Sequence, residues 1–543
     1  MYRVKQPLHW VIIGALTWVV GCGDRTPPVM SGLTFAANPS GHVPLAARAT
    51  FTTDEAAQAT VQITAGENSW VQTVIPAYQV EHSVMVLGLQ PDQTYQIVFV
   101  ATDEAGNEVR SSAYEMTTPA LPDTFPPIET ARSEPDRMEP GVTLFSVYRR
   151  TEDDRGTDFG LLLAVNVTGE VVWYYRSDEQ ISDARRLRNG NILYTGGAKR
   201  DHMYEIDMLG HMIRRWHAAG IAGDAVSGSI PVATDTFHHE VYEMPSGNFL
   251  ALSTELRQLD DYASSETDPS ASRETAHVVG GVIVEFTPEG KVIRQWKLFD
   301  VLAPYRIGYD SLGTGFWRAT YGEVVEGDIR DWLHDNGIIY DARDDAAIVS
   351  LRHGDAVVKV DLSTGELKWI LGTPEGWKDP QRARLLEPVG DLEWTFHQHA
   401  PMLTPAGNLL LYDNGNYRVR PYDEKPPPSE YYSRVVEYAI DEEAHTVSQV
   451  WVYGGPGEDR FFSNFGSDAD WLPTTGNILV THAGLTADPA GTPDDTSDDV
   501  SWARLVEVTH TTPAEIVFDL VIREGPEVGW RVYRAERLPS LYP

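Results

Sequence analysis

Histidines occur at matching places along the C-terminal part of the chain. His399 lies eight residues before Gly407, and His239 lies eight residues before Gly247, and each glycine begins a Gly-Asn turn. A neutral imidazole can act as a nucleophile or as a general acid and base. Arg352 adds a guanidinium group, which binds oxyanions in a fixed fork. Together these groups could attack, exchange protons and hold an anion if the fold brings them together.

A repeat of paired hairpins surrounds these residues. The first hairpin of each unit turns at Gly-Asn in segments 188–197, 245–253, 405–415 and 474–484, with a degenerate form at 343–353. Six second hairpins occupy segments 165–175, 206–216, 286–296, 360–370, 438–451 and 508–520. Four strands per unit over residues 131–543 predict an all-β fold, a six-bladed β-propeller, with the C-terminal residues completing the first blade. The Gly-Asn pairs themselves indicate turns and carry no function.

Propeller geometry predicts one meeting point for these side chains. The position eight residues before the turn glycine begins the innermost strand, at the mouth of the central channel, and the next strand returns to that mouth. That returning end carries Arg352, Asp413 with Asn414, or Thr481 with His482 in different blades. Strand alternation puts His334 and Asn336 on one face, to which Arg352 returns. A lone channel histidine is more often a lining residue, but this convergence favours a functional site.

The N-terminal part has a different pattern. Tyr95, Ile97, Phe99 and Ala101 alternate before a turn, as in the tyrosine-corner end of a fibronectin type III domain. We therefore expect a fibronectin type III-like β-sandwich over residues 31–120, serving as a spacer or docking module. A proline-rich linker over residues 121–130 follows it.

The first residues indicate export. Arg3 and Lys5 precede a short apolar run, and Val19-Val20-Gly21-Cys22 resembles a bacterial lipoprotein box. We expect a lipoprotein signal peptide over residues 1–21, lipidation of Cys22 and a linker over residues 22–30. A buried cysteine in a helical anchor is the alternative. The lipoprotein interpretation places the protein on the periplasmic or outer-membrane face of a bacterium, held to the membrane by its N-terminus.

Overall charge excludes one class of partner. There are 43 Lys and Arg against 79 Asp and Glu, a formal net charge of −36. Nucleic acid is excluded because a phosphate backbone needs a basic face. An anionic substrate would need cations placed locally. The oligomeric state is not fixed by the sequence, and a homodimer is one of the states it allows.

Three segments carry a family resemblance. They are DWLHDNGIIYDARDDAAIVSLRHGDAVVKVDLSTGELKWILG (331–372), FHHE (237–240), and QHAP (398–401) with the following LLYDNGNYR. They resemble bacterial arylsulfotransferases over roughly residues 130–543. The resemblance implies a six-bladed propeller behind an N-terminal β-sandwich. It also implies transfer of a sulfuryl group from a phenolic sulfate donor to a phenol acceptor, with no nucleotide donor, cofactor or metal.

The resemblance assigns roles to individual residues. The nucleophile, which becomes sulfated, falls on His399, and His334 and Arg352 fall on catalytic positions. The family's other histidine falls on His239 or its neighbour His238. Two further positions, Asn336 and Thr481, would contact substrate. The chain departs from better-known members in its lipoprotein-like start, in its lack of a cysteine pair and in its fibronectin-like N-terminal domain.

Chemistry gives each of these roles a reason. Sulfuryl transfer, like phosphoryl transfer, needs positioning and stabilisation of the equatorial oxygens. Arg352 would hold those oxygens, Asn336 and His239 could donate to the others, and His334 could exchange a proton with the phenol.

Two other functions remain open from the residues. One is a non-catalytic surface propeller that binds a glycan or a protein. The other is a metal-dependent hydrolase or lyase, since three histidines could bind a metal ion. The metal alternative gives no reason for Arg352, whose charge would repel a cation.

Overall fold

The regular secondary structure of the protein consists almost entirely of β-strands. The computed structural model describes residues 24–543 except 151–158, 198, 224–225, 458 and 525–528, so Cys22 and the expected signal peptide lie outside the described residues. Its helices are short: α1 (Ala219–Ala222), α2 (Leu298–Val301), α3 (Arg318–Tyr321), η1 (Pro135–Arg137), η2 (Gln381–Arg384), η3 (Pro428–Glu430) and η4 (Thr496–Asp498). Within the described residues, none has the length and apolar character needed to cross a membrane.

The N-terminal strands form a β-sandwich. They are β1 (Met30–Ala37), β2 (Ala47–Ala65), β3 (Asn68–Val86), β4 (Thr94–Asp103), β5 (Glu108–Arg110) and β6 (Tyr114–Thr117). Tyr95, Ile97, Phe99 and Ala101 of β4 are all buried, which confirms the alternation predicted from the sequence. By contacts, one compact unit holds most of this sandwich, and a second holds the propeller with residues Ala36–Arg48 and Met85–Gln93.

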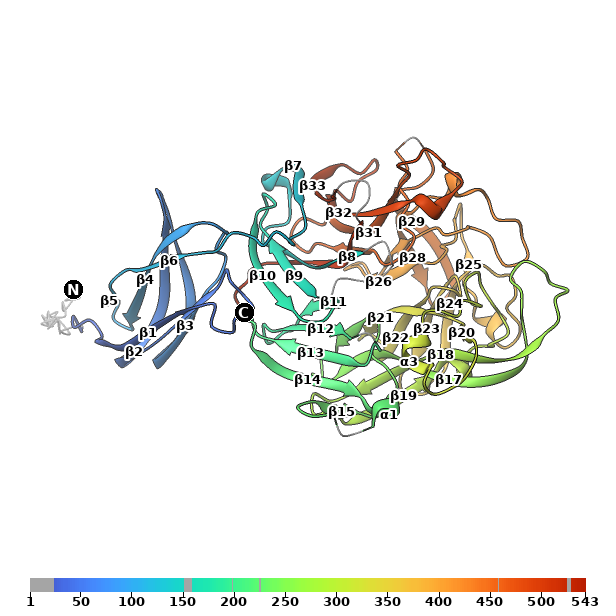
Figure 1. The fold of residues 1–543 in the computed structure, drawn as a ribbon, viewed down its shortest axis with the longest axis horizontal. Helices are drawn as coiled ribbons and strands as arrows, with labels where there is room; N and C mark the ends of the chain where they lie inside the picture. Colours follow the sequence, from blue (N-terminus) through green and yellow to red (C-terminus); the bar gives the residue numbers. More distant parts are fainter. Residues whose placement is uncertain (1–23, 151–158, 198, 224–225, 458, 525–528) are drawn as a thin grey trace, which may run out of the picture. The chain divides into compact units, whose positions relative to one another are not determined.

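The remaining strands form six antiparallel blades, which confirms the predicted β-propeller (Figure 1). Listed from the innermost strand outward, blade 1 is β34 (Gly529–Leu538), β8 (Val142–Arg150), β9 (Gly160–Val165) and β10 (Val171–Ser177). Blade 2 is β11 (Ile181–Arg186), β12 (Ile192–Gly196), β13 (His202–Ile206), β14 (Met212–Ala218) and β15 (Ile230–Val232). Blade 3 is β16 (Val241–Glu243), β17 (Phe249–Tyr262), β18 (Glu274–Phe286) and β19 (Val292–Lys297), with β20 (Ile329–Asp331) beside β18.

The other three blades follow the same order from the inside. Blade 4 is β21 (Asp335–Asp341), β22 (Ala346–Leu351), β23 (Ala356–Asp361) and β24 (Leu367–Gly372). Blade 5 is β26 (His399–Leu403), β27 (Leu409–Asp413), β28 (Arg434–Asp441), β29 (Thr446–Gly454) and β25 (Glu387–Pro388). Blade 6 is β30 (Asp468–Trp471), β31 (Ile478–Ala487), β32 (Val500–Val508), β33 (Ile516–Ile522) and β7 (Ile128–Ser133).

Both ends of the propeller sequence close the ring. β34, from the C-terminal end, pairs with β8 as the innermost strand of blade 1, as predicted. β7, from the N-terminal end, pairs with β33 as the outermost strand of blade 6. Blades 1 and 6 therefore each combine strands from opposite ends of the propeller sequence, and these two blades lie side by side in Figure 1.

Packing between blades fixes the inner strands. Leu250 and Ile283 of blade 3 share one buried cluster with Val349 and Val358 of blade 4.

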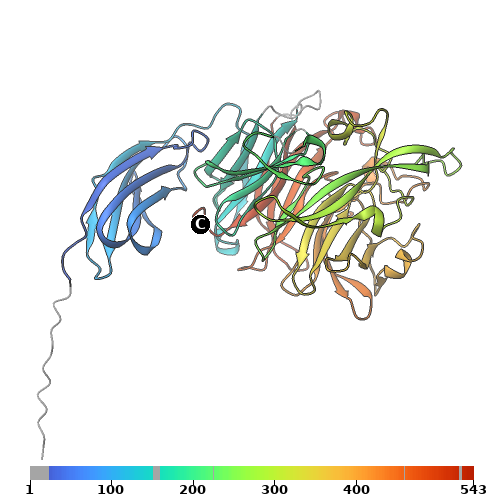
Figure 2. The same ribbon diagram turned by 90° about the horizontal axis from the view of Figure 1, so that it is seen from below.

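The turn glycine Gly407 has φ 84°, a left-handed conformation that favours glycine. The long β17–β18 hairpin (green) extends beyond the other blades in Figure 2.

Ring closure gives a stability prediction. Val532 of β34 is fully buried, whereas Val450 of β29 is 50% exposed. Val532→Ala should lower the free energy of unfolding by about 2 kcal/mol, because it removes two buried methyl groups and leaves a cavity. Val450→Ala is the matched control and should change it little. Equal effects in urea titrations would contradict a closing role for β34.

Candidate active site

A cavity of about 510 Å³ opens where the inner strands begin. Its wall includes His238 and His239 just before β16, His334 just before β21, His399 at the start of β26, and Arg352 just after β22. The backbone N–H of Arg352 donates to the carbonyl of His334 at 3.3 Å, so the arginine returns to the histidine as predicted. Hairpin geometry therefore brings these five residues, from blades 3, 4 and 5, to one cavity.

The imidazole of His399 is held in one tautomer. Nδ2 of Asn414 donates to the carbonyls of Ser463 (2.8 Å) and Gly466 (3.2 Å), so the amide oxygen must face the other way. That oxygen lies 2.6 Å from Nδ1 of His399, and the carbonyl of His397 lies 3.2 Å from the same nitrogen. Both neighbours can only accept, so Nδ1 carries the hydrogen. Nε2 is left with its lone pair, and the ring lines the cavity.

Strained backbone surrounds the cavity. His239, His334, His397 and Ala400 have φ of 56°, 48°, 56° and 54°, in the left-handed region. Each such residue costs about 1–3 kcal/mol and persists only where its surroundings hold it. Two of the four flank His399 in sequence, and two carry rings on the cavity wall. The strain is therefore concentrated where these imidazoles are positioned.

His334 forms a buried pair with Asp331. Its Nδ1 lies 2.6 Å from Oδ2 of Asp331, whose Oδ1 accepts from Nε1 of Trp317 at 2.7 Å. Burial raises the pKa of Asp331. A carboxylate on Nδ1 orients the ring and stabilises a proton on it, which suits a general acid and base at Nε2.

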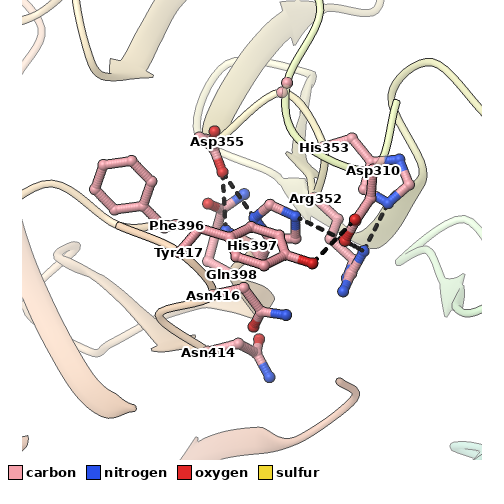
Figure 3. Close-up of polar contacts among 12 residues, drawn as sticks. Asp310, Arg352, His353, Asp355, Phe396, His397, Gln398, Asn414, Asn416 and Tyr417 are labelled. Carbon is pink, nitrogen blue, oxygen red and sulfur yellow. Dashed lines mark hydrogen bonds and ion pairs between the residues drawn. The ribbon is translucent and has the colours of Figure 1, made fainter. Parts of the chain in front are cut away.

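Arg352 is held by a histidine that the sequence did not single out (Figure 3). Nδ1 of His353 lies 2.7 Å from the carbonyl of Asp331 and must donate to it. Nε2 of His353 therefore accepts from Nη1 of Arg352 at 2.6 Å. Asp310 lies 3.6 Å from the same guanidinium, and Nη2 donates to the carbonyl of Asn464. The side chain is fixed in place on the cavity wall.

Both ring nitrogens of His397 are engaged by carboxylates. Nδ1 lies 3.0 Å from Asp355, and Nε2 lies 3.4 Å from Asp310, as Figure 3 shows. Burial and Arg352 oppose protonation, but Asp310 and Asp355 outweigh them and raise the pKa of His397. The ring of His397 is not part of the cavity wall, so it is poorly placed to act as the nucleophile in place of His399.

The histidine pair of blade 3 also has a definite arrangement. Nε2 of His238 lies 3.2 Å from the carbonyl of Ser253 and donates to it. Nδ1 of His238 then accepts from Nδ1 of His239 at 2.8 Å, which leaves the lone pair of His239 on Nε2. Of the two, His239 is therefore the ring with a free nitrogen at the cavity.

Burial keeps the imidazoles on the cavity wall neutral. Burial, then Arg352, holds the pKa of both His399 and His334 well below the usual value. Burial, then His334, does the same for His239. Burial also lowers the pKa of His238 to about 3. Neutral rings with free Nε2 lone pairs can attack an electrophile or accept a proton without first losing one.

Two residues that were predicted to contact the substrate, Asn336 and Thr481, lie behind the cavity wall. Asn336 is fully buried, and its Nδ2 donates to the carbonyl of Gln398 at 2.9 Å. Thr481 is fully buried on β31, and its hydroxyl has no hydrogen-bond partner among the described residues. His482, also expected at the rim, instead bonds Tyr412 at 2.8 Å and packs on Phe461.

Two carboxylate and histidine clusters could in principle hold a cation. They are Asp310 with His353 and His397, and Asp331 with His334 and His353. Both include His353, whose Nε2 already accepts from the guanidinium of Arg352. A permanent cation at hydrogen-bond distance disfavours a metal ion there, so the geometry supports an anion site better than a metal site.

Comparison with known proteins agrees with this geometry. A family model described as arylsulfotransferase (ASST) matches residues 128–534, and one described as an arylsulfotransferase Ig-like domain matches residues 34–119. The chain belongs to the arylsulfotransferase family. The family model also identifies the N-terminal β-sandwich as Ig-like.

Two curated members of the family are similar to part of the chain. Arylsulfate sulfotransferase AssT of Escherichia coli is 30% identical over 300 residues, covering 48% of this chain and 46% of that protein. Arylsulfate sulfotransferase AssT of Lelliottia amnigena is 33% identical over 224 residues, covering 34% and 37%. The aligned regions therefore span less than half of either relative.

Several site residues escaped the sequence analysis. Asp331, Asp310 and Phe316 come from the segment between β19 and β21, which follows no hairpin pattern. The spacing Asp331-x-x-His334 was the available signal for the pair. Tyr533, on the closing strand β34, lines the cavity with Phe316. No local pattern indicated it.

The charged state of His397 gives a pH prediction. Folding raises the pKa of His397. The protonated ring therefore stabilises the fold fully below about pH 6.5, the pKa of histidine in an unfolded chain, and this stabilisation is lost as the pH rises through the pKa in the folded protein. The difference in melting temperature between wild type and His397→Gln should therefore be larger at pH 6 than at pH 9.

His482 supplies a control of opposite sign. Burial lowers its pKa to about 3, so its contribution is present above about pH 6.5 and falls at lower pH. The difference in melting temperature between wild type and His482→Gln should therefore become smaller as the pH is lowered. If both differences moved in the same direction, the assignment of charge to His397 would be wrong.

Proposed function

We propose that the protein transfers a sulfuryl group from an aryl sulfate to a phenol, in two steps through a sulfated His399. The observation that carries the proposal is the free Nε2 of His399, fixed by Asn414 and facing a cavity that also presents Arg352. Membership of the arylsulfotransferase family supports the same chemistry. A metal is not needed in this reaction.

In the first step, Nε2 of His399 attacks the sulfur of the donor. An N–S bond forms as the bond between sulfur and the phenolic oxygen breaks, and the phenolate leaves with that electron pair. Arg352 holds the sulfuryl oxygens, where charge concentrates during transfer. When Asp331, whose pKa burial raises, is protonated, the neutral ring of His334 carries its hydrogen on Nε2 and gives it to the departing oxygen, while Nδ1 takes the proton of Asp331.

The second step reverses the first with a different phenol. Nε2 of His334 takes the proton from the acceptor hydroxyl, whose oxygen attacks the sulfur. The new S–O bond forms as the N–S bond breaks, and His399 regains its lone pair. His239 lies beside His334, with ring centroids 4.8 Å apart, and is placed to contact the same oxygens. Asn336 steadies the backbone just before His399 through the Gln398 carbonyl.

A burst experiment tests this function. Mixing wild-type protein with 4-nitrophenyl sulfate and no acceptor should release one 4-nitrophenol per site, and adding phenol should restore turnover. His399→Asn should lose both, because no other ring is aligned for attack. His397→Asn should retain the burst amplitude while reacting more slowly.

Three outcomes would count against the proposal. A normal burst in His399→Asn, or its loss in a folded His397→Asn, would move the nucleophile elsewhere. Absence of both burst and turnover with every phenol tried would favour the binding propeller.

The Asp331–His334 pair predicts a dependence on the leaving group. Phenolate is more basic than 4-nitrophenolate and needs more help from an acid. Asp331→Asn should therefore slow transfer from phenyl sulfate by roughly 10²–10³, and transfer from 4-nitrophenyl sulfate by about tenfold. Asp300→Asn, an exposed control, should change neither rate. Equal losses with both donors would indicate a purely structural role for Asp331.

We also propose that the protein is exported and lipidated on Cys22. The basic start, the short apolar run and the Val-Val-Gly-Cys sequence support this. Intact mass of protein extracted from bacterial membranes should fit a chain beginning at Cys22 with added lipid, and Cys22→Ser should abolish the lipid mass. A mature wild-type protein without lipid would refute the proposal.

A further inference from the structure

The cavity carries more positive charge than one sulfate ester requires. Arg200, Arg352 and Arg531 line it, and none of the described residues on its wall is Asp or Glu. This is a local reversal of charge in a chain of net charge −36. An aryl sulfate has one negative charge at its sulfate group, for which Arg352 is placed. The other two guanidinium groups are left without a role in the transfer itself.

Arg200 lies flat against an aromatic ring of the wall. Its guanidinium carbon is 3.9 Å from the centroid of the Phe316 ring, and Nη1 donates to the Phe316 carbonyl at 3.2 Å. Among the described residues, no carboxylate lies within ion-pair distance of it. The cation is therefore held beside the cavity by π and carbonyl contacts rather than by a direct ion pair.

Arg531, on β34, has the same kind of environment. Its guanidinium carbon is 4.2 Å from the centroid of the Phe465 ring, Nη2 donates to the hydroxyl of Ser501 at 3.3 Å, and the guanidinium also hydrogen-bonds to the side chain of Tyr148. Its Nε is buried and makes no hydrogen bond to any described residue. No carboxylate of the described chain comes within ion-pair distance of it either.

Two buried arginines of the propeller are paired with carboxylates, whereas a third, Arg306, bonds to backbone carbonyls and a threonine hydroxyl. Arg534 lies 2.8 Å from Glu240, and Arg434 lies 2.8 Å from Asp413. Pairing is what a buried cation ordinarily needs, because an unpaired one loses its hydration without compensation. Arg531 has hydroxyl partners but no carboxylate among the described residues, so an anion that enters the cavity could pair with it.

We propose that the site prefers phenols that carry a second anionic group, a carboxylate, on the ring or on a short side chain. This inference rests on the proposed sulfuryl transfer at His399. The phenolic oxygen would lie at His399 and His334, and the carboxylate would reach the guanidinium group of Arg531 where it lines the cavity. Arg200 adds positive potential from beside Phe316, and the aromatic walls contact the ring of the substrate.

Paired acceptors test the inference without any variant. With 4-nitrophenyl sulfate as donor, 4-hydroxyphenylacetate is compared with its methyl ester, which has the same phenol and no charge. Wild-type kcat/KM should be about tenfold or more higher for the acid, as expected for a charge-assisted hydrogen bond. An equal or higher value for the ester would overturn the proposal.

Variants then locate the preference. In Arg531→Gln the ratio of kcat/KM for acid over ester should fall close to one, whatever happens to the individual rates, and Arg200→Gln should lower it partly. Arg382→Gln, on the exposed surface, should keep the wild-type ratio. If Arg531→Gln kept the wild-type ratio of kcat/KM for acid over ester, the proposed contact between the carboxylate and Arg531 would be wrong. Absence of transfer to either acceptor, and to phenol itself, would instead show that the proposed function is wrong.

Discussion

One hydrogen bond sets the chemistry of the whole site. The amide oxygen of Asn414, 2.6 Å from Nδ1 of His399, fixes the hydrogen on that nitrogen and leaves Nε2 free. The amide can face only one way because its nitrogen donates to two carbonyls of the segment before β30. Burial keeps the imidazole neutral, so its lone pair is available. On the proposed mechanism, every later step depends on this nitrogen.

The propeller provides that bond by joining blades. His399 begins the inner strand of blade 5, Asn414 follows the next strand of that blade, and the carbonyls that hold Asn414 precede blade 6. Blade 4 contributes Arg352 and His353 from the end of its own hairpin. Positive φ at His397 and Ala400 shows that the backbone on both sides of His399 is strained, a cost that ring closure and inter-blade packing can support.

The sequence was sufficient for the architecture and for part of the site. Period-two strands and Gly-Asn turns predicted six blades, and turn register placed His239, His399 and Arg352 at one mouth. Strand alternation wrongly predicted that Asn336 faces the cavity. A bulge between Asp335 and Gly337 interrupts the strand register, so the amide of Asn336 lies behind the cavity wall. Asp331, Asp310 and the tautomer of His399 depend on irregular segments and on carbonyls from another blade, for which a single sequence has no periodic signal.

The most direct test of the account is the site of the covalent adduct. Wild-type protein is mixed with an aryl sulfate in the absence of acceptor, quenched at alkaline pH, where sulfo-histidine survives, digested and sequenced by tandem mass spectrometry. The account predicts one sulfuryl group, on His399, which disappears when phenol is added before the quench. An adduct on His397 or His334, or catalytic transfer with no histidine adduct at all, would contradict it.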